Sequence, residues 1–213
     1  MKITKYEHAC LVLEEQGKKL VIDPGSFVQT KLNSLKDVVG IVITHVHGDH
    51  LDKDHIKEIF DNNPDIPIFA TQEVADEIKD FKVTVVTGGD TGDCGPFKLR
   101  FFGGQHAIIH SSLPTNQNVG VLVNDSFYYP GDSFTIPDGA KVQTLAIPTS
   151  APWLKMGEVI DFLLAIKPSK VFPTHNGLNS ELAEGMFDSR LGTIAKDQNA
   201  DYHYLAIGDS IEV

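Results

Sequence analysis

A chain of 213 residues, 41% of them hydrophobic, is long enough to bury one substantial core and short for two, so we expect a single domain over residues 1–213. The formal net charge of −11 argues against the basic surface with which nucleic-acid-binding domains neutralise phosphates. No segment approaches the roughly 18 consecutive apolar residues of a membrane span, and the N-terminal MKITKYEHACLVLEE lacks the apolar stretch of a secretion signal.

The two cysteines, Cys10 and Cys94, cannot supply a disulfide framework. Together with the missing secretion signal, they favour a reducing, cytoplasmic location. We therefore expect a small-molecule substrate, with neither nucleic acid nor a membrane as partner. The sequence leaves the oligomeric state open.

Strands outnumber helices among the expected elements, and the two kinds are mixed in order. Short apolar or alternating runs predict strands, and apolar side chains spaced by three or four residues predict helices. In chain order we expect strands at 9–14 and 19–22 around a Gln16-Gly17 turn, a buried strand at 38–44, a helix at 54–61, a strand at 66–70, a helix at 72–80, strands at 83–87, 98–102, 120–123, 127–129 and 143–147, a helix at 158–166, a strand at 171–173 and a last helix within 180–195. This order predicts a layered α/β domain with helices on the outer faces of its sheets.

The segment with the clearest chemistry runs from Thr44 to Asp52 and follows the buried strand directly. It places His45, His47, Asp49 and His50 within six positions. Histidines two residues apart cannot share a helix face, but on a bending chain they can converge on one ion. Imidazole and carboxylate without thiolate favour Zn²⁺, with Mn²⁺ or Fe as alternatives.

The run His45-x-His47-x-Asp49-His50 resembles the signature motif of the metallo-β-lactamase superfamily, and supporting parts follow in order along the chain. His106 in Gly-Gln-His-Ala resembles the third histidine ligand, Asp132 in Tyr-Pro-Gly-Asp-Ser the bridging aspartate, and His175 in Pro-Thr-His-Asn-Gly the last histidine. The resemblance implies a four-layer αββα sandwich. Within the superfamily, Tyr6-Glu7-His8-Ala9-Cys10 and Ala151-Pro152-Trp153 are similar to the ascorbate-6-phosphate lactonase-like branch of small metal-dependent hydrolases.

The resemblance also implies a two-metal mechanism. His45, His47 and His106 would bind one Zn²⁺, Asp49, His50 and His175 would bind the second, and Asp132 would bridge them. A hydroxide shared by the two ions would attack a small lactone, ester, amide or phosphoester. Asp49 would also accept a proton from the attacking water, so Asp49 and Asp132 are the expected catalytic residues. The alternatives are a metal-dependent nuclease or phosphodiesterase and a protein that binds metal and ligand without turnover.

Four further residues are expected around this centre. Asp23, at the end of an early strand, is expected to orient a ligating histidine, and His8 to lie either in strand packing or at the edge of the site. His110 competes with His106 for the third histidine position; Gly103-Gly104, which lets the backbone turn inward, favours His106 and leaves His110 as a surface or pocket residue. Trp153 is expected either to wall the substrate pocket or to anchor a helix on the sheet.

Overall fold

The first sheet is organised around a tight hairpin at Gln16 and Gly17. Both residues have left-handed backbones (φ 50° and 73°), and such a turn matches the twist of the paired strands it joins. In the computed structural model, which describes residues 1–213, seven strands lie in the order β14-β1-β2-β3-β4-β5-β6. Their bounds are β1 Lys2–Lys5, β2 Leu11–Glu15, β3 Lys18–Ile22, β4 Val38–Ile43, β5 Ile68–Ala70, β6 Val83–Val85 and β14 Ser210–Glu212.

The second sheet joins an antiparallel half to a parallel half. Its order is β13-β12-β11-β10-β9-β8-β7, where strands up to β10 pair antiparallel and strands from β10 to β13 pair parallel. The strands are β7 Thr91–Cys94, β8 Phe97–Gly103, β9 Val119–Val123, β10 Phe127–Tyr129, β11 Thr144–Pro148, β12 Lys170–Thr174 and β13 Asp201–Tyr202.

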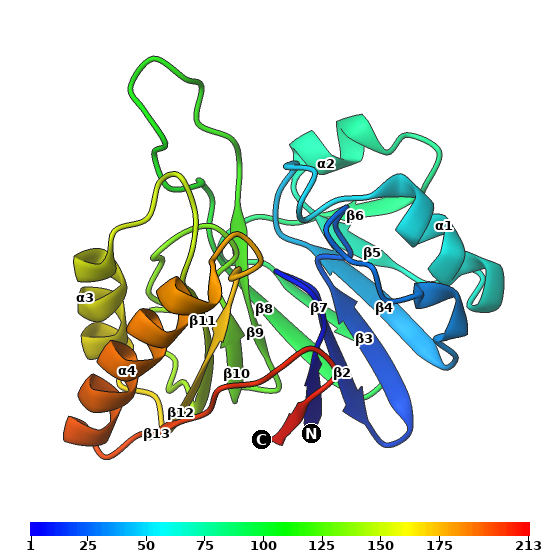
Figure 1. Cartoon of the computed structure of the whole chain (residues 1–213). Helices are drawn as coiled ribbons and strands as arrows, with labels where there is room; N and C mark the ends of the chain where they lie inside the picture. The colour runs from blue at the N-terminus through cyan, green and yellow to red at the C-terminus, as the bar shows by residue number, and fades with distance from the viewer.

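Helices cover the outer face of each sheet (Figure 1). α1 (Lys53–Asn62) packs on the first sheet through Ile56 and Ile59, together with α2 (Gln72–Glu77) and a short 3-10 turn at Leu32–Ser34. α3 (Met156–Ile166) and α4 (Glu181–Asp197) cover the second sheet. None of the helices is both long and apolar enough to cross a membrane.

The apolar core between the two sheets holds the sandwich together. Phe101, Phe127 and Phe172 from the second sheet pack there with Leu13 and Ile22 from the first, all nearly inaccessible to solvent. Burial of such side chains is worth roughly 1.5–3 kcal/mol each. The predicted αββα sandwich is therefore confirmed.

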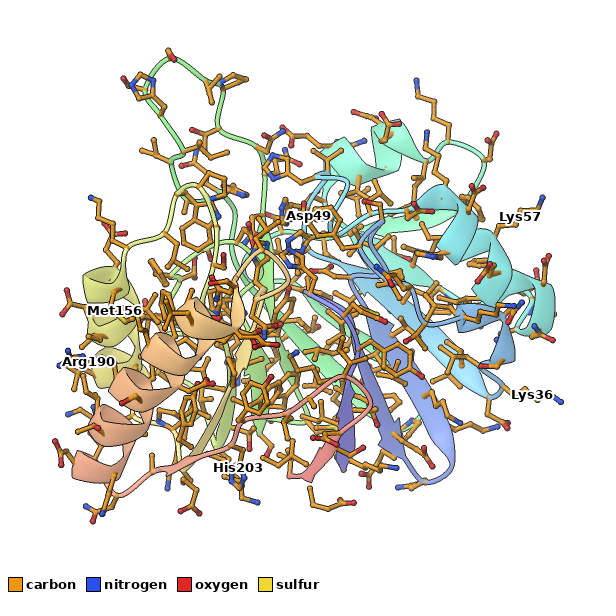
Figure 2. The ribbon with its side chains drawn as sticks, viewed as in Figure 1. Lys36, Asp49, Lys57, Met156, Arg190 and His203 are labelled. Carbon is orange, nitrogen blue, oxygen red and sulfur yellow. The ribbon has the colours of Figure 1, made fainter.

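Strand direction collects polar side chains at one edge of the sandwich. β3 and β4 are parallel, as are β10, β11 and β12, and the carboxyl ends of parallel strands meet on the same edge. Asp23 directly follows β3, His45 comes two positions after the end of β4, and His175 directly follows β12. Asp49, labelled in Figure 2, lies at the same edge between the two sheets.

Candidate metal centre

The loop after β4 is pressed closely against the loop after β3. A Cβ atom on Gly25 would stand 1.9 Å from the backbone oxygen of Asp49, so only glycine permits this approach. The amide of Ser26 donates to the carbonyl of Gly48 at 2.8 Å. The loop after β4, which carries the histidines, is therefore held in place by the loop after β3.

One group of side chains consists of His45, His47, His106 and Asp132. One ligand-capable atom from each lies within 4.8 Å of those of the others. Nε2 of His45 is 3.1 Å from Nδ1 of His47, and Nε2 of His106 is 3.4 Å from Oδ2 of Asp132. His45, His106 and Asp132 are buried.

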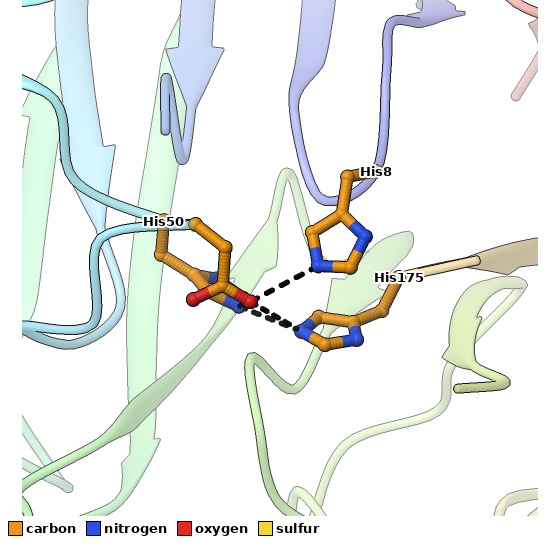
Figure 3. Close-up of side chains that lie close together, drawn as sticks. His8, His50 and His175 are labelled. Carbon is orange, nitrogen blue, oxygen red and sulfur yellow. Dashed lines mark hydrogen bonds and ion pairs between the residues drawn. The ribbon is translucent and has the colours of Figure 1, made fainter. Parts of the chain in front are cut away.

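The second group consists of His8, Asp49, His50 and His175, again within 4.8 Å. Nε2 of His50 is 3.0 Å from Nε2 of His175, and Asp49 Oδ2 is 3.3 Å from His175 Nε2. Figure 3 shows His8 and His175 side by side, with their rings turned toward His50.

Asp132 lies between the two groups. Its Oδ1 is 3.2 Å from Nε2 of both His50 and His175, whereas its Oδ2 faces His106 and accepts a 2.9 Å hydrogen bond from the Trp153 indole. The carboxylate thus turns one oxygen to each group, as a bridging ligand would.

The ring nitrogens that face each group need a cation between them. His50 donates from Nδ1 to Asp23, and His175 donates from Nδ1 to the Ser150 carbonyl, so their Nε2 atoms carry lone pairs when the rings are neutral. These lone pairs face each other at 3.0 Å. Nε2 of His106 and Oδ1 of Asp132 are buried without a hydrogen-bond partner. Such unpaired buried acceptors are costly, and a divalent metal ion in each group would satisfy them.

Asp23 contacts Thr44 and His50, which places it to orient histidines of both groups. Its Oδ1 accepts the Thr44 amide and its Oδ2 the Thr44 hydroxyl, both at 2.8 Å. The same Oδ2 accepts from His50 Nδ1 at 2.7 Å. The Thr44 hydroxyl lies 3.0 Å from Nδ1 of His45, so one buried carboxylate sets the orientation of a histidine in each group.

His8 has the opposite tautomer from its neighbours. Its Nδ1 accepts the backbone N–H of Gly177 at 3.1 Å, so in the neutral ring the proton is on Nε2. Nε2 then donates to Asp49 Oδ2 at 3.0 Å. The ring is buried, and burial lowers its pKa, which keeps it neutral. Sequence reasoning placed His8 no closer than the edge of the site; the structure places it in contact with Asp49.

Three residues of the site have left-handed backbones, which cost a non-glycine residue about 1 kcal/mol or more. They are His8 (φ 56°), Asp23 (φ 48°) and His175 (φ 57°). Each follows directly on a turn or strand end, where the surrounding hydrogen bonds hold it; the His175 amide, for instance, donates to the His8 carbonyl at 2.8 Å.

In the metal-free centre, Asp49 and Asp132 carry negative charge and His50 and His175 carry positive charge. Burial alone would lower the pKa of His50 and His175, but Asp132, assisted by Asp23 or Asp49, raises the pKa of His175 to about 9 and that of His50 well above its usual value. Conversely, burial and the neighbouring His50 lower the pKa of His45. The pKa of Asp132 is held well below its usual value, against the effect of burial, by His50 and His175.

A cavity of about 330 Å³ opens over both groups. Its polar lining includes His47, Asp49 and Asp132, and Trp153 forms part of its wall. Trp153 also packs edge-on against Phe134, which in turn contacts Phe162 of α3. His110 lies outside this lining, on the exposed segment after β8, where its Nδ1 pairs with the Ser112 hydroxyl at 2.7 Å.

Residues 2–175 match the family model for the β-lactamase superfamily domain. The chain belongs to the β-lactamase superfamily. A protein of Mycobacterium tuberculosis is 32% identical over 196 residues, which cover 90% of this chain and 91% of the relative. A UPF0173 metal-dependent hydrolase of Pyrococcus horikoshii is 26% identical over 195 residues, which cover 82% of this chain and 84% of the relative.

Solved structures agree with this superfamily assignment at the level of the fold. A metallo-β-lactamase fold protein of Bacillus subtilis superposes with a TM-score of 0.77 at 15% identity, covering 100% of this chain and 99% of its own. Superfamily membership and the paired histidine and aspartate groups confirm the prediction of a metal-dependent hydrolase.

Proposed function

We propose that this hydrolase binds two Zn²⁺ ions and cleaves a small lactone, ester, amide or phosphoester. The observation that carries the proposal is the pair of histidine and aspartate groups, in each of which four ligand-capable atoms lie within 4.8 Å of one another, joined through Asp132 and open to one cavity. Imidazole and carboxylate donors without thiolate favour zinc over softer or harder ions, with Mn²⁺ and Fe as the alternatives.

His45, His47 and His106 would hold one ion, and Asp49, His50 and His175 would hold the other, while the Asp132 carboxylate turns one oxygen to each group. His8 would be a neighbour of the second ion and not a ligand. A histidine ligand needs an unprotonated nitrogen toward the metal, and the Nε2 of His8 carries the proton.

Divalent ions at such a centre lower the pKa of a water molecule and stabilise negative charge on the substrate oxygen. The residues of this chain position the reacting groups. His8 donates to Asp49 Oδ2 and so fixes how that carboxylate is turned, and Asp49, which lines the cavity, is placed to accept the proton of the attacking water. The Trp153 indole fixes Asp132 in the same manner.

A small molecule fits this site better than a nucleic acid does. No lysine or arginine lines the cavity, and the chain carries a net charge of −11, so the site offers no basic side chains for the phosphates that flank a cleaved bond in a nucleic acid. We further propose a reducing compartment, the cytoplasm, because both cysteines are free and buried.

The test combines metal analysis with a substrate panel. Protein reconstituted with zinc should hold about two equivalents and hydrolyse at least one member of a panel of p-nitrophenyl esters, γ-lactones, anilides and bis-p-nitrophenyl phosphate. Chelation should abolish turnover, and zinc should restore it. Two bound equivalents without turnover of any panel member would support the ligand-binding alternative instead, and failure to take up metal would contradict the proposal altogether.

A further inference from the structure

Three exposed apolar side chains surround the mouth of the cavity at the metal centre. Phe27, Ile109 and Leu178 line it and are 42%, 39% and 56% exposed; we call them the apolar rim. Large apolar side chains left in water beside a polar centre indicate a surface that becomes covered when a ligand binds.

Each rim residue sits on the same short segment as a residue of the centre. Ile109 and Leu178 come three positions after His106 and His175, and Phe27 four positions after Asp23. The segment that carries Ile109, between β8 and β9, projects above the body of the molecule in Figure 1. Each rim residue therefore lies within four positions of a residue of the metal centre and lines the same cavity.

The remaining cavity lining carries no lysine or arginine for an anionic substituent. Its charged members, Asp49 and Asp132, belong to the centre itself. An adjoining cavity of about 620 Å³ shares Ser26 and Phe27 and contains Lys5. That lysine is buried, and the carboxylates of Glu7 and Glu184 line the same cavity and counter its charge.

We propose that the substrate carries an uncharged apolar group next to the bond that is cleaved, and that this group lies on the apolar rim. The inference rests on the proposed hydrolytic function and narrows it to uncharged esters, lactones or amides with an aliphatic or aromatic substituent. The absence of a basic side chain from the same lining disfavours sugar phosphates and other substrates with an anionic substituent.

Trp153 allows occupancy to be measured without turnover. It is the only tryptophan of the chain and lines this cavity, so its fluorescence reports on a ligand at the centre. Zinc-loaded protein would be titrated with acetohydroxamic, hexanohydroxamic and octanohydroxamic acid, which share one metal-binding head group. We expect affinity to rise about twofold per methylene, below the limit for full burial because the rim is open on one side.

Substitution of the rim should remove this dependence on chain length. Leu178→Ser and Ile109→Ser should bind octanohydroxamic acid at least fivefold more weakly, while their affinity for acetohydroxamic acid stays within twofold. The matched control is Leu182→Ser, because Leu182 is 77% exposed on α4 and does not line the cavity; it should behave as the unchanged protein does.

Affinity independent of chain length, or binding of glucose 6-phosphate as tight as that of octanohydroxamic acid, would overturn the inference. So would a self-association that Leu178→Ser abolishes while the chain-length dependence is absent, since the rim would then be a contact between copies. Chain-length dependence without any turnover would instead contradict the hydrolytic function and leave the apolar rim as a binding surface.

Discussion

Asp132 contacts His50 and His175, whereas His8 contacts Asp49, and these contacts give the two residues different roles. Asp132 turns an oxygen toward each group, so Asp132→Ala should lose metal and lower kcat at least 100-fold. His8→Ala should keep two equivalents and lower kcat about 10-fold, because it removes only the donor to Asp49. Metal analysis and steady-state kinetics on the most active panel substrate would measure both.

A positioning role for His8 also predicts which substitution restores activity. His8→Gln keeps an N–H near the Asp49 carboxylate and should recover most of the rate lost in His8→Ala. Imidazole ¹⁵N–¹H correlation spectra should show the proton of His8 on Nε2 both with and without metal. Loss of one metal equivalent in His8→Gln, or a metal-shifted Nε2 resonance for His8, would make it a ligand and contradict the tautomer argument.

Two histidines four positions apart, His106 and His110, are the candidates for the third histidine ligand of the first group. His106→Ala should lose metal and activity together, since a site of three histidines reduced to two leaves preferred zinc coordination. His110→Ala is the matched control: its side chain pairs with Ser112 on an exposed segment, so metal content should not change. The reverse outcome for the two variants would exchange their assignments.

At the scale of elements, the approach of the loop after β3 to the loop after β4 sets the shape of the centre. Gly25→Ala should displace the backbone at Asp49 and His50, because the new Cβ would meet the Asp49 oxygen. We expect metal affinity to fall at least 10-fold. Gly157→Ala, at a glycine of α3 with no atom within 4 Å of its added Cβ, should leave metal affinity unaltered. Isothermal titration with zinc measures both; equal affinities would show that the loop can move aside.

The elements predicted from sequence are those with strong apolar patterns. VVGIVIT gave the buried strand β4, and the stripe of Val159, Phe162 and Leu163 gave α3. The sequence does not predict strands β1, β7, β13 and β14, because they are short and mostly polar. α2 ends at Glu77 and not at the predicted residue 80, where an isolated apolar position suggested another turn of helix.

The candidate site was predictable where residues are close in sequence and less so where only the fold joins them. The residues from His45 to His50 follow one strand and could be grouped directly. The place of His8 depends on the Gly177 amide and on Asp49, which come from distant loops. No local pattern around His8 encodes those contacts, since Tyr6-Glu7-His8 reads equally well as a strand end.

At the scale of the whole molecule, pH should affect the metal-free and metal-loaded proteins differently. The pKa of His175 is about 9 in the folded metal-free protein against 6.5 as its ordinary value. A raised histidine pKa contributes stability below 6.5 that is lost as pH rises to 9, here on the order of 3 kcal/mol. His50 acts in the same direction.

The melting temperature of the metal-free protein should therefore fall by several degrees between pH 6.5 and 9. The zinc-loaded protein should not show this fall, because metal has replaced those protons. Scanning calorimetry at constant ionic strength would compare the two. Parallel pH dependence with and without zinc would mean that the histidine charges of the metal-free state contribute nothing to folding.

Each of the two groups takes members from both halves of the chain, and in polymer terms a metal ion held there is a cross-link. His50 and His175 are 125 positions apart, so an ion held between them would close a long loop of the folded chain and would have to be released before the two sheets could separate. Metal should thus slow unfolding of the sandwich as a unit. Amide exchange in β4 and β12, on opposite sides of the core, should slow together when zinc is added.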